Sequence, residues 1–362
     1  MSTKIGILGA GQLARMLALA GYPLGLEFVF LCPARDACAA PLGEHLCAGF
    51  EDPAALQALA GKVDRITYEF ESVPAGAVAH LEAQRPVWPP SQALAIARDR
   101  LHEKRLFNRL GIDTAPFEAV DSLANLRQAV ARLGLPAILK TRTLGYDGKG
   151  QQRLHEATEL EAAWEGLGGA PAILEGWVPF EREVSIIAVR SLAGELAFYP
   201  LSENRHQAGI LRCSTGILDD PLQAQAQDYA RRLLEHLDYA GVLAVEFFQI
   251  EDRLLANEMA PRVHNSGHWT IEGAETSQFE NHLRAILGLP LGSTALRGRP
   301  GMVNLIGALP DMRALLAVPG AHVHLYGKTP RPGRKLGHVT VCREDDGESL
   351  RRVQALAEGA GA

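Results

Sequence analysis

The first thirty residues follow the order strand, glycine turn, helix and strand, and this order restricts the possible folds more than any other feature. Apolar runs at Lys4–Leu8 and Leu26–Leu31 predict strands, and helical spacing of apolar residues in Gln12–Ala20 predicts a helix between them. Such a unit builds a parallel sheet with helices on its faces. We therefore expect an N-terminal doubly wound α/β domain, which ends at a proline-rich linker over residues 85–90.

The turn Gly9–Gly11 places backbone N–H groups at a helix N-terminus, which is a ready anion site. It matches a dinucleotide fingerprint except at the third glycine, where Ala14 is a tolerated variant. The acidic residue that should bind the ribose about 20 residues later is missing, since residues 31–33 are Leu, Cys and Pro. We expect the turn to bind a phosphate and not a nicotinamide cofactor. A purely structural turn is the alternative.

Two glutamates lie near the end of a later strand in this domain. Apolar and polar residues alternate through Arg65–Glu71, so Glu69 and Glu71 share one face just before Ser72 ends the strand. Ligands of α/β sheets bind at the carboxyl ends of the strands. A ligand site and a solvated sheet edge are equally good interpretations of these two carboxylates.

A β-hairpin is predicted near residue 250. The apolar runs Val242–Ile250 and Leu254–Ala260 flank a polar turn. If the hairpin is symmetric about Asp252, Glu246 lies directly opposite Glu258. Opposed like charges destabilise a sheet, so the pair favours a cation between its carboxylates. Magnesium is commonly held by two carboxylates and substrate phosphates. The alternative is a solvated hairpin with its glutamates apart in water.

The segment Pro261–His268, which follows the hairpin, has polar side chains at nearly every position. Arg, His, Asn and Ser packed so closely indicate a ligand-binding loop rather than an ordinary surface loop. Zinc binding by His264 and His268 is a poor fit, because no third His or Cys ligand is spaced nearby and Gly267 opposes a helix that would align them.

A second glycine-rich segment is a candidate phosphate-binding loop. The strand Ala137–Lys140 ends in a lysine, three glycines follow between Gly145 and Gly150, and Gln151–Leu154 can return as a strand. This is not a Walker loop, because no GxxxxGK[ST] precedes a helix. It is a glycine hairpin that can lie over phosphates with its amides inward while Lys140 neutralises charge.

Composition excludes several classes of protein. The net charge of −6 gives no electrostatic reason to bind nucleic acid or an anionic membrane. Five cysteines without CxxC spacing suit a reducing cytoplasm. The N-terminus lacks a signal-peptide profile, and no apolar run approaches the roughly 18 residues of a membrane span. We expect a soluble cytoplasmic protein.

Read in order, the motifs are GAGQLARM, GYDGKG, NEMAPRVHNSGHW and YGKTPRPGRKLGHVT. This series resembles the ATP-grasp superfamily. Within the superfamily the chain resembles the N5-carboxyaminoimidazole ribonucleotide synthetases of de novo purine biosynthesis, over nearly its whole length. NEMAPRVHNSGHW and GRKLGHVT are specific to that family, whereas the glycine loop and the glutamate pair occur more widely among ATP-grasp ligases.

The resemblance implies an ATP site, with magnesium, or manganese in its place, held by Glu246 and Glu258. The implied ATP-binding residues are Arg100, Lys140, Gly145, Tyr146, Asp147, Gly148, Lys149, Gly150, Glu175, Trp177, Val178, Glu183, His206 and Asn257. The chain departs from the family at Ala14 and at Leu144, where many relatives have glycine.

The resemblance also implies a site for 5-aminoimidazole ribonucleotide. Its implied residues are Gly11, Gln12, Glu69, Tyr146, Asp147, Lys149, Arg262, His264, Asn265, Ser266, Lys328, Arg334 and Lys335. The last three would hold the ribonucleotide phosphate. The residues expected to act in catalysis are Lys140, Arg262, His264 and Asn265.

The activity implied is carboxylation of the amine of 5-aminoimidazole ribonucleotide with ATP and bicarbonate, giving ADP and phosphate. Bicarbonate is a poor electrophile, so ATP would convert it to carboxyphosphate in a closed site that excludes water. Positioning and charge neutralisation would supply most of the catalysis. For His264, proton transfer and a pure hydrogen-bonding role both stay open.

Three other functions are weighed against this one. A different ATP-grasp ligase, such as the formate-using glycinamide ribonucleotide transformylase or a biotin-carboxylase-like enzyme, fits the HNSGHW segment less well, and no biotinyl-lysine motif is present. A non-catalytic nucleotide-binding relative is opposed by the retention of Lys140, Glu246 and Glu258. A Rossmann oxidoreductase comes last.

The expected architecture has three parts: an N-terminal pre-ATP-grasp domain over residues 1–98, an ATP-grasp region with its lid over 99–296, and a small C-terminal domain over 297–362. The family resemblance implies a homodimer, and no residue pattern indicates its surface.

Overall fold

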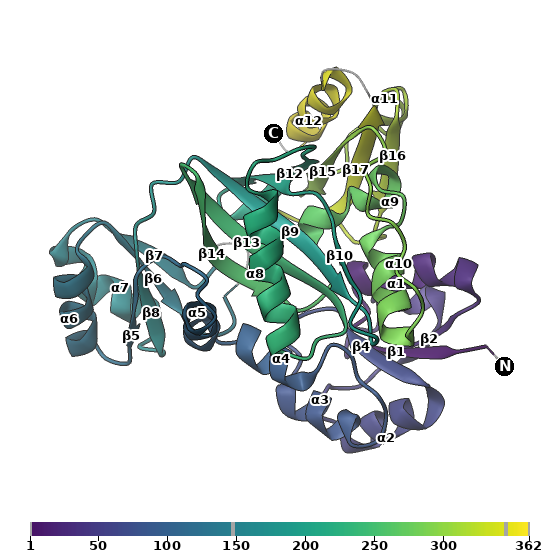
Figure 1. The fold of residues 1–362 in the computed structure, drawn as a ribbon, viewed down its shortest axis with the longest axis horizontal. Coiled ribbons are helices and arrows are strands. Elements are labelled where there is room, and N and C mark those ends of the chain that lie inside the picture. The colour runs from purple at the N-terminus through teal and green to yellow at the C-terminus, as the bar shows by residue number, and fades with distance from the viewer. Residues whose placement is uncertain (1, 146–148, 344–346, 361–362) are drawn as a thin grey trace.

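The computed structural model describes residues 2–145, 149–343 and 347–360. Figure 1 shows a long central sheet that joins three peripheral parts. The N-terminal domain lies at the lower right, a small sheet with α6 and α7 lies at the left, and the C-terminal helices α11 and α12 lie at the top. The C-terminal strands belong to the central sheet itself and extend it toward these helices.

The N-terminal domain has a parallel sheet in the order β3-β2-β1-β4. Its strands are β1 (Lys4–Leu8), β2 (Glu27–Leu31), β3 (Glu44–Leu46) and β4 (Arg65–Tyr68). Its helices are α1 (Gln12–Gly21), α2 (Pro53–Lys62), α3 (Ala75–Glu82) and α4 (Ser91–Ala97). Helix α1 packs on the face that carries Ile5 and Ile7, and α2 and α3 pack on the opposite face. The expectation of a doubly wound domain is confirmed.

The small sheet on the left of Figure 1 forms the lid. It is antiparallel, in the order β5-β8-β6-β7. Its elements are β5 (Phe117–Val120), α6 (Leu123–Leu133), β6 (Ala137–Thr141), β7 (Gln151–Leu154), α7 (Leu160–Gly166) and β8 (Ala172–Gly176). The predicted strands at 137–140 and 151–154 therefore pair as expected, with the glycine loop between them.

Helix α5 (Arg100–Arg109) connects the N-terminal domain to the lid. Its first turn is capped by Asp99, whose Oδ1 accepts hydrogen bonds from the backbone N–H groups of Leu101 and His102. The same carboxylate forms an ion pair with Arg142 at the start of the glycine loop. The N-cap therefore connects the start of α5 to the lid.

The central sheet is antiparallel throughout, in the order β14-β13-β9-β11-β12-β15-β17-β16, with β10 beside β9. Its strands are β9 (Arg182–Arg190), β10 (Leu196–Phe198), β11 (Ser202–Gln207), β12 (Ile210–Gly216), β13 (Gly241–Ile250), β14 (Arg253–Ala260), β15 (Arg299–Ile306), β16 (Ala321–Leu325) and β17 (Lys335–Arg343). The remaining helices are α8 (Gln223–His236), α9 (Thr270–Gly273), α10 (Gln278–Leu287), α11 (Met312–Leu316) and α12 (Glu348–Ala360).

Each face of this sheet is covered by a different set of helices. Alternate residues of β9 point in opposite directions: Val184 and Ile186 pack with α8 and α5, whereas Ile187 and Val189 pack with α10 and with α1 of the N-terminal domain. Strand β15 pairs with both β12 and β17, so the C-terminal segment has no separate sheet of its own among the described residues.

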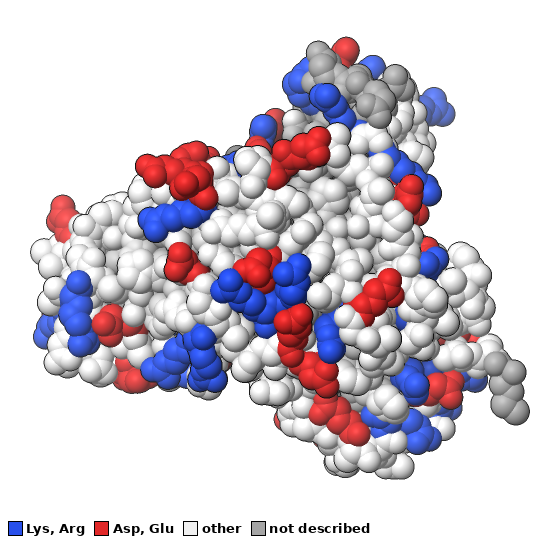
Figure 2. Space-filling view, viewed as in Figure 1, with Lys and Arg blue, Asp and Glu red and all other residues white. Residues whose placement is uncertain are grey.

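The visible surface carries mixed charge. Figure 2 shows acidic and basic side chains interspersed over this face of the molecule, in keeping with the net charge of −6. Within the described ranges, no helix combines the length and apolar character needed to cross a membrane.

Candidate active site

The two hairpin glutamates face each other as expected, but by a different route. The turn is tighter than a hairpin symmetric about Asp252, because Ile250 pairs directly with Arg253. Continued without interruption, this register would place Glu246 opposite Asn257. A bulge inserts Asn257 and restores the pairing of Glu246 with Glu258. The symmetric register was wrong, and the pairing it predicted is confirmed.

The two carboxylates differ in their charge environment. Arg100 donates to Glu258 Oε2 at 2.9 Å, and His264 Nε2 lies 3.4 Å from Glu246 Oε1. Burial and the charge of Glu258 raise the pKa of Glu246 to about 7. Burial also acts to raise the pKa of Glu258, but the charge of Arg100 outweighs it and the pKa falls. Glu246 therefore holds a proton more readily than Glu258 does.

Lys140 is the second-last residue of strand β6 and lies in a buried ion cluster. Its Nζ lies 2.9 Å from Glu175 Oε2, and Lys104 Nζ approaches the same oxygen at 3.5 Å. All three side chains are less than one-tenth exposed. Burial would raise the pKa of Glu175, but the two lysines outweigh it and hold the pKa at about 2. Glu175 Oε1 is buried with no hydrogen-bond partner among the described residues.

Lys104 is expected to be needed for nucleotide binding, because it is the second counter-ion of Glu175. In Lys104→Met, Glu175 would depend on Lys140 alone and hold it more tightly, so less of the Lys140 charge would reach a phosphate. We expect the KM for ATP to rise roughly tenfold, the cost of about one charge-assisted hydrogen bond. Steady-state kinetics measure this, with exposed Lys62→Met as the control. An unchanged KM would contradict the counter-ion role.

Glu103, the residue before Lys104 in α5, is also a buried carboxyl group. Its Oε1 accepts a hydrogen bond from the backbone N–H of Met259 at 2.6 Å, and it is 2% exposed. Burial, followed by the charge of Glu258, raises the pKa of Glu103 to about 8. Glu103 therefore keeps its proton to a higher pH in the folded protein than in the unfolded chain.

This difference in protonation makes folding stability depend on pH. Between about pH 4.5 and pH 8 the folded state binds a proton that the unfolded state has lost, so stability falls as pH rises, by at most about 1.4 kcal/mol per pH unit. Glu103→Gln keeps the acceptor and removes the titration. We expect its thermal midpoint to fall less than that of the wild type between pH 5.5 and 7.5. Equal slopes would contradict the assignment.

Glu183 and His206, both expected near the nucleotide, form a pair on neighbouring strands. His206 Nδ1 lies 2.6 Å from Glu183 Oε2. Burial acts to lower the pKa of His206, but the hydrogen bond to Glu183 and the charge of Glu246 outweigh it and raise the pKa. This places His206 close to Glu246 as well.

Part of the glycine loop and its surroundings is described. Tyr146, Asp147 and Gly148 lie outside the described residues. Leu144 has a φ of 63°, in the region that favours glycine, and its side chain is 73% exposed. Gly150, with a φ of 71°, approaches Thr141 so closely that an added Cβ would lie 2.6 Å from the hydroxyl. The loop backbone therefore needs glycine at 150 and tolerates leucine at 144.

The expected adenine-binding residues lie at the edge of the lid. Val178 packs with Ala115 and Leu255 in a small apolar cluster beside the hairpin. Trp177 is 40% exposed, with the Arg153 guanidinium 5.4 Å from its ring. These residues form an apolar ledge beside the Lys140 cluster.

The N-terminal glycine turn binds a side chain of the protein itself. Strand β4 ends at Tyr68, earlier than expected, and Glu69 turns toward the N-terminus of α1. Its oxygens accept hydrogen bonds from the backbone N–H groups of Gly11 and Ala14. A Cβ at Gly9 or Gly11 would lie within 3 Å of this carboxylate. The glycines admit Glu69, so these two N–H groups have a protein partner in place of the expected phosphate.

The expected phosphate-binding residues of the ribonucleotide site come together across the chain. Lys328 Nζ donates to Gln12 Oε1, although the two residues are 316 positions apart. Arg334 donates to the backbone carbonyl oxygen of Thr329 at 3.1 Å. The Lys335 charge acts to lower the pKa of both Glu246 and His264, so the start of β17 lies near these two residues.

The polar segment after the hairpin is held rigidly. Arg262 forms a 2.6 Å ion pair with Glu71, the second glutamate after β4. Asn265 exchanges two hydrogen bonds with Asn304 of β15, at 3.1 and 2.7 Å. His264 and Ser266 bond to each other through the imidazole Nδ1 and the hydroxyl. His264 connects this segment to the hairpin, because its Nε2 lies 3.4 Å from Glu246 Oε1.

Sequence reasoning missed Glu103, Lys104 and Asn304. The sequence does carry a signal for the first two. One face of α5 combines charged and apolar residues at helical spacing, namely Arg100, Glu103, Lys104 and Phe107. Charged groups on such a face indicate buried partners. No local signal marks Asn304, whose partner is 39 positions away.

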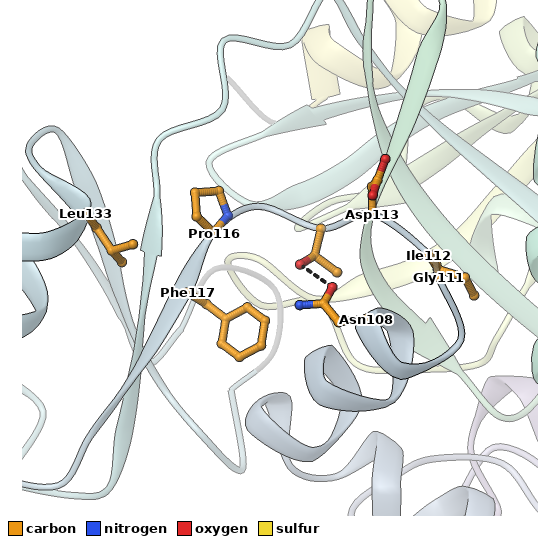
Figure 3. Close-up of a pocket in the computed structure, with 8 residues that line it drawn as sticks. Asn108, Gly111, Ile112, Asp113, Pro116, Phe117 and Leu133 are labelled. Carbon is orange, nitrogen blue, oxygen red and sulfur yellow. Dashed lines mark hydrogen bonds between the residues drawn. The ribbon is translucent and has the colours of Figure 1, made fainter.

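A separate cavity of about 530 Å³ lies where α5 leads into the lid. Figure 3 shows Asn108, Pro116, Phe117 and Leu133 around it, with Thr114 bonded to Asn108 at 3.1 Å. None of the charged groups described above lines it.

Comparison with family models divides the chain into three matches. The ribonucleotide synthetase preATP-grasp domain matches residues 1–98, and the ATP-grasp domain matches residues 105–279. The phosphoribosylaminoimidazole carboxylase C-terminal domain matches residues 301–352.

Whole-chain comparisons agree with these matches. The N5-carboxyaminoimidazole ribonucleotide synthase of Pseudomonas aeruginosa is 58% identical, covering 98% of this chain and 99% of its own. The crystal structure of the synthetase from Thermus thermophilus has a TM-score of 0.93 at 56% identity, covering 97% and 98%. The Aspergillus clavatus enzyme in complex with ADP and 5-aminoimidazole ribonucleotide has a TM-score of 0.91 at 32% identity, covering 99% and 98%.

Proposed function

Since the chain belongs to the N5-carboxyaminoimidazole ribonucleotide synthase family, we propose how its residues divide the work of this reaction. The protein is an ATP-dependent ligase that carboxylates the amine of 5-aminoimidazole ribonucleotide in de novo purine biosynthesis. Bicarbonate is the proposed source of the carboxyl group, activated by ATP as carboxyphosphate, with ADP and phosphate as products.

Arg100, Lys140 and the glycine loop hold the ATP phosphates in this proposal. The buried Lys140–Glu175–Lys104 cluster supports it, because it stores positive charge in a water-poor site where that charge acts strongly on phosphate oxygens. Adenine lies on the apolar ledge formed by Trp177 and Val178, and Glu183 takes the ribose hydroxyls. His206 lies toward the phosphates, and the loop residues Gly145, Lys149 and Gly150 cover them.

Glu246 and Glu258 are the proposed ligands of magnesium, with manganese as a possible substitute. The fit is supported by two opposed carboxylates and by Asn257 Oδ1, which is buried without a hydrogen-bond partner among the described residues. When bound, magnesium would neutralise phosphate charge during transfer. Because of the bulge, Asn257 and Glu258 are consecutive residues of β14, and Glu258 pairs with Glu246 of β13. The two carboxylates and the amide therefore come from neighbouring positions of the hairpin.

Arg262, His264 and Asn265 bind bicarbonate and the carboxyphosphate formed from it. Support comes from their rigid setting, because Glu71 orients Arg262 and Asn304 orients Asn265. Pre-oriented donors stabilise developing negative charge without reorganising during the reaction. Closure of the lid would exclude water, which would otherwise hydrolyse the intermediate.

The ribonucleotide phosphate lies near Lys328, Arg334 and Lys335, with Gln12 alongside. Ser266 lines the neighbouring cavity, and Gly11 and Glu69 shape it through the bond between them. The amine of the ribonucleotide then attacks the activated carboxyl carbon.

We further propose that the chain divides into three domains, with boundaries after residues 98 and 296. We also propose that the protein is a homodimer in the cytoplasm. Its partners in this proposal are small-molecule substrates, and it binds neither nucleic acid nor a membrane. Cys32, Cys38, Cys47 and Cys213 are free thiols, as suits a reducing compartment. Light scattering of the purified protein tests the dimer.

The observation that carries this proposal is the opposed glutamate pair between the Lys140 cluster and the His264 segment. The test measures ADP release with magnesium, bicarbonate and 5-aminoimidazole ribonucleotide, omitting each component in turn. Turnover should need the ribonucleotide and magnesium and should rise with bicarbonate. Turnover indifferent to bicarbonate would overturn the proposed carboxyl source.

A further inference from the structure

A row of buried polar side chains crosses the central sheet and ends at His264. Ser185 of β9 is the backbone partner of Glu246, and Asn204 of β11 pairs with Ser214 of β12. The serines are fully buried and Asn204 is 5% exposed. No step of the mechanism above uses these three residues.

Their side chains form a continuous series of hydrogen bonds. Ser214 Oγ bonds to Asn204 Oδ1 at 2.5 Å, and Asn204 Nδ2 donates to Ser185 Oγ at 3.0 Å. Ser185 Oγ bonds to Ser266 Oγ at 2.7 Å, and Ser266 Oγ lies 2.9 Å from His264 Nδ1. The series therefore runs from β12 across β11 and β9 to the imidazole.

The direction of the last bond is set by the backbone. The N–H of Ser266 also points at His264 Nδ1, at 3.3 Å, because the imidazole caps the short 3-10 helix Asn265–Gly267. A backbone N–H only donates, so Nδ1 carries no proton. Ser266 Oγ–H must then donate to Nδ1, and Ser266 Oγ must accept from Ser185.

The rest of the series agrees with this direction. The amide of Asn204 donates to Ser185, which leaves the Ser185 hydroxyl proton for Ser266. The Ser214 hydroxyl proton goes to the Asn204 carbonyl oxygen. Every proton points toward His264, and the ring holds its own proton on Nε2, the atom 3.4 Å from Glu246.

We propose that Ser185, Asn204 and Ser214 are positioning residues that hold His264 in its Nε2–H tautomer, as a hydrogen-bond donor to anionic oxygens and not as a base. This rests on the proposed function, in which His264 contacts bicarbonate and its phosphorylated form. A donor aimed at those oxygens stabilises the charge that develops there, whereas the other tautomer would present a lone pair and repel it.

The first arm of the test needs no variant. Nitrogen-15 NMR of the imidazole rings distinguishes a protonated from an unprotonated ring nitrogen, and the signals of His264 are assigned by their loss in His264→Gln. We expect His264 to show a protonated Nε2 and an unprotonated Nδ1. A protonated Nδ1 in the wild-type protein overturns the proposal, whatever the kinetics show.

The second arm cuts the series at Ser185. Ser185→Ala should move the nitrogen signals of His264 toward a mixture of tautomers and raise the bicarbonate KM roughly fivefold, the net worth of about one hydrogen bond. The ATP KM should stay within about twofold. Ser185→Thr, which keeps the hydroxyl, should restore both. Asn204→Ala cuts the next bond and serves if Ser185→Ala does not fold.

Ser191→Ala is the matched control, since this serine is also buried and, within the described part of the chain, its Oγ has only a local bond, from the backbone N–H of Glu195. It should leave the His264 signals and both KM values unchanged. Unchanged signals in Ser185→Ala, or equal rises in the ATP and bicarbonate KM, overturn the proposal. Turnover independent of bicarbonate would instead defeat the proposed function and leave the tautomer measurement standing.

Discussion

Replacing Glu258 by glutamine is expected to lower ATP turnover by about a thousandfold or more while the protein stays folded. The carboxylate faces Glu246 across the hairpin and accepts the Arg100 hydrogen bond, so its charge acts on both the proposed metal and the nucleotide. Removing one group that stabilises transition-state charge typically costs about 10²–10³ in rate, and loss of a metal ligand adds to this. The measurement is steady-state ADP release at saturating magnesium.

The matched control is Glu251→Gln at the exposed tip of the same hairpin, which should keep full activity. Circular dichroism and thermal unfolding show whether each variant is folded. Normal turnover in Glu258→Gln would remove the argument for a metal held by the glutamate pair.

Replacing Lys335 by alanine is expected to raise the KM for 5-aminoimidazole ribonucleotide about 10- to 100-fold and the KM for ATP by less than about threefold. Lys335 begins β17, which pairs with β15 in the same sheet as the hairpin, so its backbone position is rigid. Loss of one charge-assisted hydrogen bond to phosphate costs about 1.5–3 kcal/mol of binding free energy, which corresponds to a rise in KM of about 10- to 100-fold.

The control for this variant is Arg331→Ala, which removes an exposed positive charge from the loop just before β17. Both substrates are titrated for each variant under the same magnesium concentration. An equal rise in both KM values in Lys335→Ala would place the phosphate pocket elsewhere.

Local elements could be predicted well from the sequence. Strands at Lys4–Leu8 and Gln151–Leu154 have the expected bounds, and the hairpin strands differ by one residue at their starts. These segments are short and their apolar pattern matches the period of a strand. The expected strand through Glu71 was too long, because the alternation continues past the point where the chain turns toward α1.

The candidate site was predicted partly from local pattern and partly from resemblance. The opposition of Glu246 and Glu258 came from strand periodicity, although the real register depends on a bulge that no local pattern indicates. The meeting of Gln12 with Lys328 came from resemblance alone. The roles of Lys104 and Glu69 came only from the structure, since each depends on a partner that folding brings from another element.

The sequence by itself determined the strands, the helices, the hairpin and the kinds of side chain available for phosphate, metal and bicarbonate. These follow from interactions between residues near one another in the chain. Only the tertiary structure decided which charges are buried together and which way the protons of the Ser185–Asn204–Ser214 series point. That order depends on strands β9, β11 and β12 lying side by side, and the pairing of β9 with β11 is set by the packing of the whole sheet.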